Sequence, residues 1–238
     1  MSNTVGVVGD AGVAEAVRDA GYSVVRGTPE DVPTADSVVA VGSDAVRAVA
    51  TADGDSLVLP VDAGRGVRSV SRAAVGDAVD ALDDATVERH PVLSVTVAGE
   101  PTGMAVWDVT VVTADAAHIS EYAIQTPTDA VGKFRADGVT VATPAGSPGY
   151  ARRIGGPILA PSDAVGVVAP VAPFATSPDH WVLPIDALSL SVERDEATVA
   201  LFVDGTRRGT VDCGDAVSLA LSGTARVAVV GASRSRFD

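Results

Sequence analysis

Two aspartates in the first third of the chain, Asp44 and Asp62, stand directly after apolar runs. The runs, residues 37–41 and 57–61, have the length and composition of buried strands. If both strands belong to one parallel sheet, the two aspartates lie at its carboxyl edge, where open α/β sheets bind ligands. The spacing leaves a second interpretation for Asp44, a helix N-cap whose carboxylate accepts backbone N–H groups.

Glycines follow the second of these aspartates, because Gly64 and Gly66 stand close after Asp62. Such glycines either admit a ligand close to the backbone or make a turn, and the pattern leaves both interpretations open. Another series, Gly-x-x-Gly-x-x-Gly at residues 6–12, differs from the dinucleotide fingerprint G-x-G-x-x-G. We interpret it as a tight turn from a strand into a helix.

The elements that must position these residues follow from the hydrophobic pattern. Up to residue 88, apolar runs alternate with Ala-rich segments of helical length, which predicts a parallel sheet covered on both faces. The predicted strands are residues 4–8, 23–25, 37–41 and 57–61, and the predicted helices are residues 11–20, 44–50 and 67–82. We therefore expect a Rossmann-like α/β domain over residues 1–88.

After residue 88 the apolar residues alternate with period two, and Gly, Pro and Asp turns separate the runs. The runs 93–98, 105–112, 138–142 and 197–203 are predicted as antiparallel strands, and residues 150–155 as a short helix. We expect a β-rich, sandwich-like domain over residues 89–238. The last apolar run, residues 226–230, could return to the first domain.

The net charge of −14 comes from 17 basic and 31 acidic residues. Such a chain lacks the clustered basic surface that nucleic acids require, so we expect no nucleic-acid partner. Only Lys133 is a lysine, and an acidic, lysine-poor composition is typical of the cytoplasmic proteins of halophiles. The mean hydropathy of +0.29 excludes a disordered acidic chain.

The single cysteine, Cys213, cannot form an internal disulfide, and we expect it to be a small buried apolar residue and not a nucleophile. We expect neither a signal peptide nor a membrane span, because no run reaches about 18 apolar residues. The three histidines, His90, His118 and His180, have no spacing typical of a metal cluster, so no metal ligands are predicted.

The segment from residue 135 to 158 carries the most specific motif. It contains Asp137-Gly138, then Thr143-Pro144-Ala145-Gly146-Ser147-Pro148-Gly149-Tyr150, then Gly155-Gly156-Pro157-Ile158. This resembles the NAD kinase family, which usually reads DG(L/I)-x-V-x-TPTGSTAY and then GGP(I/L). Further family motifs match in order: GGDGT at residues 42–46, Asn-x-G-x-x-G at 61–66, Asn-Glu or Asn-Asp at 107–108, P-(I/V)-x-P-H-S-L and LVLP at 169–174 and 181–184, and DGQ and GD-x-V at 203–205 and 213–217.

The resemblance implies a phosphotransferase that binds NAD in a cleft between the two domains. A phosphoryl group would pass from ATP or polyphosphate, with Mg²⁺, to the adenosine 2′-hydroxyl of NAD, and Asp44 would be the base. By the same resemblance the chain assembles as a dimer or tetramer. The implied cofactor-binding residues, for the small-molecule dinucleotide and the phosphoryl donor, are Gly42, Ser43, Asp62, Gly64, Arg65, Trp107, Asp108, Asp137, Ala145, Pro148, Gly149, Tyr150 and Arg153.

Several positions depart from the family pattern. Ser43, Ala45 and Val46 replace the glycines and threonine of GGDGT, and Val46 adds β-branched bulk where we expect an unusual backbone angle. Trp107 replaces asparagine and either stacks on a base or ribose or packs under the sheet. Further replacements are Pro148, Gly149, Phe174, Arg152 and Arg153. The two arginines would meet either the phosphates of a dinucleotide or carboxylates of the chain.

These replacements leave a second interpretation open, a relative that binds NAD(H) or NADP(H) without turning it over and serves as a sensor or scaffold. A kinase acting on another hydroxyl is a third possibility, but no lipid-facing apolar segment supports a lipid substrate.

Overall fold

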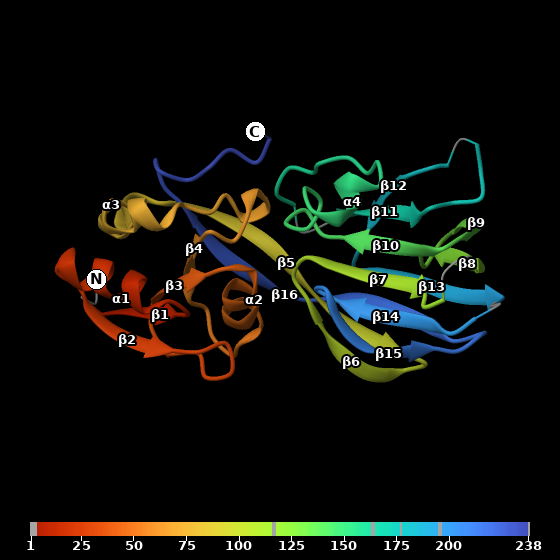
Figure 1. The fold of residues 1–238 in the computed structure, drawn as a ribbon, viewed down its shortest axis with the longest axis horizontal. Helices are drawn as coiled ribbons and strands as arrows, with labels where there is room; N and C mark the ends of the chain where they lie inside the picture. The colour runs from red at the N-terminus through yellow and green to blue at the C-terminus, as the bar shows by residue number, and fades with distance from the viewer. Residues whose placement is uncertain (1–3, 116–117, 163–164, 177, 195–196, 238) are drawn as a thin grey trace. The chain divides into compact units, whose positions relative to one another are not determined.

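The computed structural model describes residues 4–115, 118–162, 165–176, 178–194 and 197–237. The chain forms two compact units (Figure 1). Unit 1 contains the described residues up to His90 and from Thr224 onward, and unit 2 contains Pro91–Gly223. Two long strands, β5 (Thr86–Val97) and β16 (Ala216–Val229), begin in one unit and end in the other.

Unit 1 is an α/β unit with a parallel sheet. Its strands stand in the order β2-β1-β3-β4, and the end of β16 adds to β4 in parallel through Arg226 beside Leu57. The elements are β1 (Thr4–Val8), α1 (Ala11–Asp19), β2 (Ser23–Gly27), β3 (Ser37–Val41), α2 (Ser43–Thr51), β4 (Leu57–Val61) and α3 (Val75–Asp80). Three 3₁₀ turns accompany them, Arg65–Val67, Arg72–Ala74 and Leu82–Asp84.

Helices cover both faces of this sheet. Val39 and Leu59 belong to one core cluster with apolar residues of α1 and α3. Their neighbours Val38 and Val58 are equally buried, and α2 packs against β3 and β4. Because successive residues of a strand face opposite sides, α2 covers the face opposite to α1 and α3.

The prediction of one long helix over residues 67–82 is wrong. Val70 forms a parallel bridge with Val61, donating its N–H to the Pro60 carbonyl and accepting the Asp62 N–H, each at 2.9 Å. The backbone groups of Val70 therefore pair with the end of β4, and the regular helix is shortened to α3. The short-range apolar spacing cannot reveal this competing long-range pairing.

Unit 2 is a sandwich of two mainly antiparallel sheets. One has the order β16-β13-β8-β9, with β5 beside β16 and β6 beside β5, and the other has the order β12-β11-β10-β7-β14-β15. Its elements are β6 (Glu100–Ala105), β7 (Asp108–Thr113), β8 (Ser120–Gln125), β9 (Ala130–Ala136), β10 (Gly138–Ala142), α4 (Tyr150–Arg153), β11 (Val165–Val171), β12 (Trp181–Pro184), β13 (Ala187–Arg194), β14 (Val199–Val203) and β15 (Thr206–Val211).

The core of unit 2 lies between these two sheets. Leu188 and Leu190 of β13 belong to the same buried cluster as Val109 of β7 and Val139 of β10. Period-two burial of this kind is what two packed sheets require. The predicted fold class, a parallel α/β part followed by a β-rich part, is confirmed.

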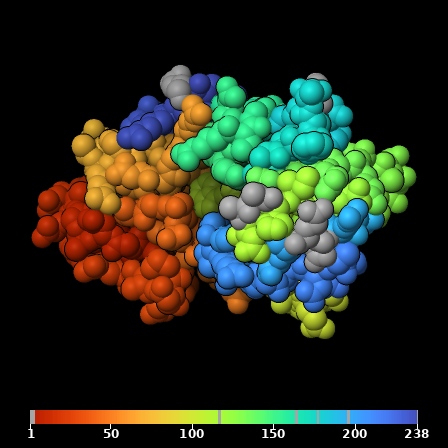
Figure 2. Space-filling view, turned by 45° about the vertical axis from the view of Figure 1, so that its right-hand side comes forward, coloured from red at the N-terminus to blue at the C-terminus, as the bar shows by residue number. Residues whose placement is uncertain are grey.

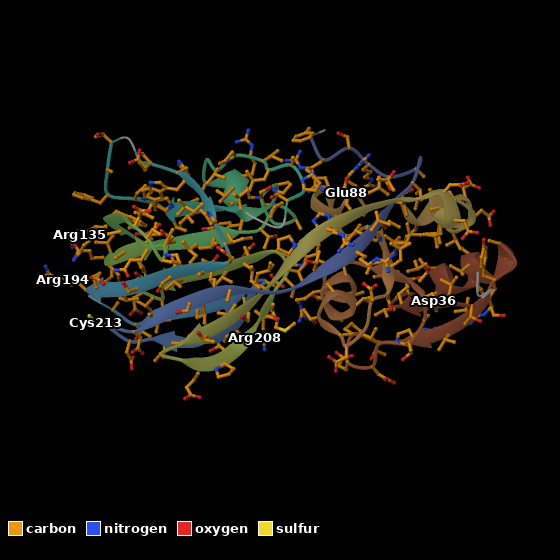
Figure 3. The ribbon with its side chains drawn as sticks, turned by 180° about the vertical axis from the view of Figure 1, so that it is seen from behind. Asp36, Glu88, Arg135, Arg194, Arg208 and Cys213 are labelled. Carbon is orange, nitrogen blue, oxygen red and sulfur yellow. The ribbon has the colours of Figure 1, made fainter. Side chains whose placement is uncertain are left out.

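Cys213 corrects one expectation, because its side chain is exposed and not buried. It follows β15 in a turn whose Asp215 N–H donates to the Asp212 carbonyl at 3.0 Å, and it lies at the surface of unit 2 (Figure 3). Its Sγ lies 3.3 Å from the Glu193 carbonyl oxygen, to which it donates. A residue in such a turn has no core to enter.

Candidate functional site

Gly42 turns the chain from β3 into α2. Its φ is 84°, in the region that favours glycine, and its N–H donates to the Val61 carbonyl at 2.8 Å. Gly42 occupies the N-cap position, with no side-chain cap hydrogen bond among the described residues, and Asp44 lies exposed in the first turn. The N-cap interpretation of Asp44 is therefore wrong. The first N–H groups of α2 point toward the carboxyl edge of the sheet, where an anion can accept them.

Ala45 and Val46 differ from the family pattern for a reason of packing. Both side chains are buried beneath α2, so they belong to the core of unit 1. Val46 lies inside the helix, and the unusual backbone angle expected there is absent. The left-handed conformation is confined to Gly42, where an added Cβ would meet nothing within 4 Å. The backbone at Gly42 is thus open to close approach by a ligand.

The end of β4 carries a group of charged side chains. Asp62 has a φ of 48°, and its Oδ2 lies 3.3 Å from Nε of Arg72. Arg72 Nη1 also lies 3.6 Å from Oδ2 of Asp10, so it connects the ends of β1 and β4. Arg234 Nη2 lies 3.9 Å from Asp62 Oδ1. The carboxyl edge of the unit 1 sheet therefore gathers arginines in a chain of strongly negative charge.

Asp10 explains the structure of the glycine series at residues 6–12. It caps α1, accepting the N–H groups of Gly12 at 2.8 Å and Val13 at 3.2 Å, while Gly9 has a φ of 112°. The interpretation as a strand-to-helix turn is confirmed.

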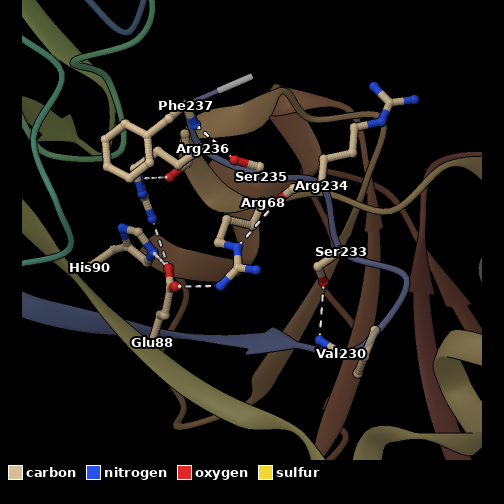
Figure 4. Close-up of polar contacts among 10 residues, drawn as sticks. Arg68, Glu88, His90, Val230, Ser233, Arg234, Ser235, Arg236 and Phe237 are labelled. Carbon is tan, nitrogen blue, oxygen red and sulfur yellow. Dashed lines mark hydrogen bonds and ion pairs between the residues drawn. The ribbon is translucent and has the colours of Figure 1, made fainter.

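The loop after β4, residues 62–70, carries Gly64 and Arg65. Hydrogen bonds with Arg236 and Glu88 hold this loop. Arg236 is buried and donates through Nη1 to the Gly66 carbonyl and through Nη2 to Glu88 Oε2 at 2.7 Å (Figure 4). Arg68, within the loop, donates to Glu88 Oε1 at 3.3 Å.

Glu88 is the carboxylate on which this network converges. Burial alone would raise the pKa of Glu88, but its contacts with His90, the charge of Arg236 and a hydrogen bond from Arg68 hold it at about 2. His90 is itself fully buried, with Nε2 3.5 Å from Glu88 Oε2. The loop thus depends on one ionised acid.

We expect Glu88→Gln to lower the free energy of unfolding by about 2 kcal/mol at neutral pH, because the amide accepts hydrogen bonds but cannot balance Arg236. Glu88 has a lower pKa in the folded chain than its ordinary 4.5, so its stabilisation is complete above pH 4.5 and disappears as the pH falls through about 2. Denaturant unfolding of both proteins between pH 2 and 7, in high salt, measures this.

The matched control is Glu15→Gln, which removes an exposed carboxylate of α1 in the same unit. It should leave the free energy of unfolding within about 0.5 kcal/mol. Equal effects of the two substitutions, or a difference that does not shrink in acid, would show that the network does not stabilise unit 1.

In unit 2, the Trp107–Asp108 segment and the Thr143–Ser147 turn are built onto each other. Thr143 Oγ1 donates to the Val106 carbonyl at 2.6 Å, and its N–H donates to the Trp107 carbonyl at 3.0 Å. A Cβ added to Gly146 would overlap the Trp107 carbonyl oxygen. The two motifs, 36 residues apart in sequence, therefore meet backbone to backbone, and only glycine fits the contact.

Asp108 is partly buried at the start of β7. Burial raises the pKa of its carboxyl, and the negative charge of Asp204 raises it further, to about 6, while a hydrogen bond with Thr110 opposes the rise. A carboxyl group that titrates near pH 6 both donates and accepts hydrogen bonds within the physiological range. Such perturbed acids cluster at binding and catalytic sites.

The residues after this turn lead to the surface. Ala145 is buried, Pro148 is partly buried, and Gly149 and Tyr150 are exposed. Arg152 and Arg153, in α4, are also exposed. In the space-filling view, the green segment around residue 150 lies at the surface (Figure 2).

Asp137 lies elsewhere in unit 2. In the ladder of β10 with β7, Gly138 pairs with Val112 at one end and Ala142 with Asp108 at the other. Asp137 precedes Gly138 and is five residues from Ala142, so about 17 Å along the strand separates it from Asp108. The Asp137 carbonyl accepts the Thr113 N–H at 2.7 Å and the Tyr122 hydroxyl at 3.2 Å. The structure does not bring Asp137 together with the other unit 2 candidates.

Apart from Asp137, the predicted site residues therefore form two local groups, one in each unit. Gly42, Ser43 and Asp44, with the Asp62–Arg65 segment, belong to the carboxyl edge of unit 1. Sequence reasoning missed Asp204, whose carboxylate holds the Trp107–Asp108 segment, and Ser147, whose buried Oγ accepts the Leu159 N–H at 2.9 Å. Both stand inside motifs that were recognised, but only the structure shows what they contact.

Comparison with known proteins places this geometry in context. The family model described as the ATP-NAD kinase C-terminal domain matches residues 107–230, just over half of the chain. NAD kinases of Methanosarcina barkeri and Methanosarcina acetivorans are 36% and 38% identical to this chain over 124 residues. That segment is 51% of this chain and 44% of each relative, so it spans less than half the length of the curated relatives.

Two solved structures share the fold. Yeast NADH kinase complexed with NADH has a TM-score of 0.78 at 16% identity, covering 96% of this chain and 84% of its own. An NAD kinase from Archaeoglobus fulgidus in complex with ATP has a TM-score of 0.73 at 22% identity, covering 94% and 92%. Within the described residues, no helix is long and apolar enough to span a membrane, and no three or more His, Cys, Asp or Glu side chains are grouped to hold a metal ion.

Proposed function

This chain belongs to the NAD kinase family, and from that premise we propose that it transfers a phosphoryl group from ATP to the adenosine 2′-hydroxyl of NAD, giving NADP. One observation carries the proposal. Hydrogen bonds from Thr143 join the Trp107–Asp108 segment to the turn that leads to exposed Tyr150, and Asp108 is a carboxyl of raised pKa. A polar carboxyl and an exposed aromatic ring suit a ligand with both polar and aromatic groups.

In this proposal Asp44 is the general base. Its carboxylate is exposed at the first turn of α2, where it can accept the proton of a hydroxyl group as the phosphoryl group is transferred. Phosphoryl transfer depends chiefly on positioning and charge stabilisation, so one oriented carboxylate suffices on the acceptor side.

The dinucleotide contacts proposed in unit 2 are Trp107, Asp108, Ala145, Pro148, Gly149, Tyr150 and Arg153. Trp107 offers a face for a base or ribose, and Asp108 a hydrogen-bonding carboxyl. Arg153 offers a fork of donors to the diphosphate. Asp137, a strand length away from Asp108, is a proposed contact only for a group at that other end of β10.

The donor contacts proposed in unit 1 are Gly42, Ser43, Asp62, Gly64 and Arg65. The residues fit a phosphate chain, because the backbone at Gly42 is open and the N–H groups that begin α2 have no side-chain cap among the described residues. The donor is ATP or polyphosphate, and Mg²⁺ bound to its phosphates would neutralise charge that develops during transfer.

We also propose that the protein works in the cytoplasm of a halophile and as a homo-oligomer. The acidic, lysine-poor composition supports the first. The second rests on the family resemblance alone. Assays therefore belong in high salt.

The second candidate function is binding of NAD(H) or NADP(H) without turnover, which the replacements at residues 43, 45 and 46 leave open. Calorimetry with NAD and a coupled assay for NADP, both in high salt, separate the two. Saturable NAD binding with NADP formation supports the kinase. Binding without NADP from either donor leaves the binding protein, and no binding of NAD, NADH or NADP would contradict both.

A further inference from the structure

Asp204 lies in the turn from β14 to β15 and reaches back to the start of β7. Its Oδ1 accepts the N–H groups of Trp107 at 2.7 Å, Asp108 at 3.1 Å and Val106 at 3.2 Å, and its Oδ2 accepts Val106 at 3.0 Å. The backbone N–H of Asp204 donates to the Asp108 carbonyl at 2.9 Å. One side chain thus gathers three consecutive backbone donors.

This arrangement fixes a segment that no strand ladder holds at that point. Residues 106 and 107 lie between β6 and β7. Hydrogen bonds to a carboxylate are stronger than those to a neutral acceptor, and three partly buried N–H groups left without one would be costly. Asp204 and Gly205 form the two-residue hairpin turn between β14 and β15, and their φ values of 49° and 74° are those that such a tight turn requires.

We propose that Asp204 is a positioning residue, which holds Trp107 and Asp108 in their ligand-binding arrangement through these backbone hydrogen bonds. The inference rests on the proposed function, in which both residues contact the dinucleotide. Asp204 itself contacts no part of the ligand in this proposal. Its carboxylate is saturated by N–H groups of the chain.

Asp204 also influences the protonation of the residue that it positions. After burial, its negative charge is the next cause of the raised pKa of Asp108. The groups that face the Asp108 carboxyl are Asp204, from the β14–β15 turn, and Thr110, from β7 itself, whose hydrogen bond opposes the rise. Asp108 therefore donates a hydrogen bond below about pH 6 and only accepts above it, so ligand binding should change across that pH.

The first test needs no ligand. The three proteins compared are the wild type, Asp204→Asn and the control Asp212→Asn. Their carbon NMR spectra report the Asp108 carboxyl, and their amide spectra report residues 106–108, from pH 4 to 8. Asp212 is exposed in the same unit, so its substitution removes the same charge elsewhere. We expect Asp204→Asn to lower the Asp108 midpoint from about 6 and to shift all three amide resonances. An unchanged midpoint and unchanged amides would overturn the inference.

The second test measures NAD affinity by calorimetry on the same three proteins at pH 7.5. We expect Asp204→Asn to weaken NAD binding about ten-fold, a change of about 1.4 kcal/mol, and Asp212→Asn to leave it unchanged. Unaltered affinity in Asp204→Asn, with NAD bound by the wild type, would overturn the positioning role. If the wild type binds no NAD, the proposed function fails, and the NMR titration still decides whether Asp204 holds the segment.

Discussion

Replacing Asp44 with asparagine is expected to lower kcat for NADP formation about 10³-fold, because asparagine cannot accept the hydroxyl proton. NAD affinity should change less than about three-fold, since Asp44 is an exposed residue whose neutral analogue keeps its shape. Steady-state kinetics and calorimetry, both in high salt, give the two values. A fall in kcat with constant affinity is the signature of a group that acts only in the reaction.

The matched control for this experiment is Asp36→Asn. Asp36 directly precedes the amino end of β3, whereas Asp44 follows its carboxyl end, and both side chains are exposed. Asp36→Asn should retain full activity. Comparable activity in Asp44→Asn and the wild type would remove Asp44 from the reaction, and equal losses in both variants would point to a general effect of charge.

Gly146→Ala is expected to lower the free energy of unfolding by about 3 kcal/mol and to abolish measurable NAD binding. The added Cβ would overlap the backbone oxygen of Trp107. Because the clashing atom belongs to the backbone, no side-chain rotation can relieve the overlap. The turn that carries Thr143 must then separate from the Trp107–Asp108 segment. Denaturant unfolding and calorimetry with NAD measure the two effects.

Gly223→Ala is the control, because a Cβ added there meets no atom within 4 Å and the residue lies in β16 of the same unit. Its free energy of unfolding should stay within about 0.5 kcal/mol of the wild type. If Gly146→Ala were as stable as Gly223→Ala and bound NAD normally, the close contact between the two motifs would not exist in solution.

Much of the fold could be predicted from local pattern. The strands that end before Gly42 and Asp62 were predicted with their observed bounds, because buried apolar runs between turn residues have few alternatives. The prediction of a helix over residues 67–82 failed where Val70 pairs with β4, because short-range spacing cannot show a contact between separate segments.

The candidate site was predictable in its motifs but not in its grouping. Asp137 and Asp108 look equivalent in the sequence, and only the register of β10 against β7 places them at opposite ends of a strand. Asp204 reads as an ordinary turn aspartate, because its partners at residues 106–108 are almost 100 positions away in the chain. Contacts across strands need the register, which one sequence alone does not specify.

Phosphorus NMR of a mixture of the protein, NAD, ATP and Mg²⁺ in high salt tests the proposed reaction most directly, because it identifies the atom that receives the phosphoryl group. We predict a new 2′-phosphomonoester resonance that grows with the wild type and is missing with Asp44→Asn. If neither ATP nor polyphosphate gives a phosphomonoester on the ribose, even where ATP is hydrolysed to ADP and inorganic phosphate, the proposed NAD kinase reaction is contradicted.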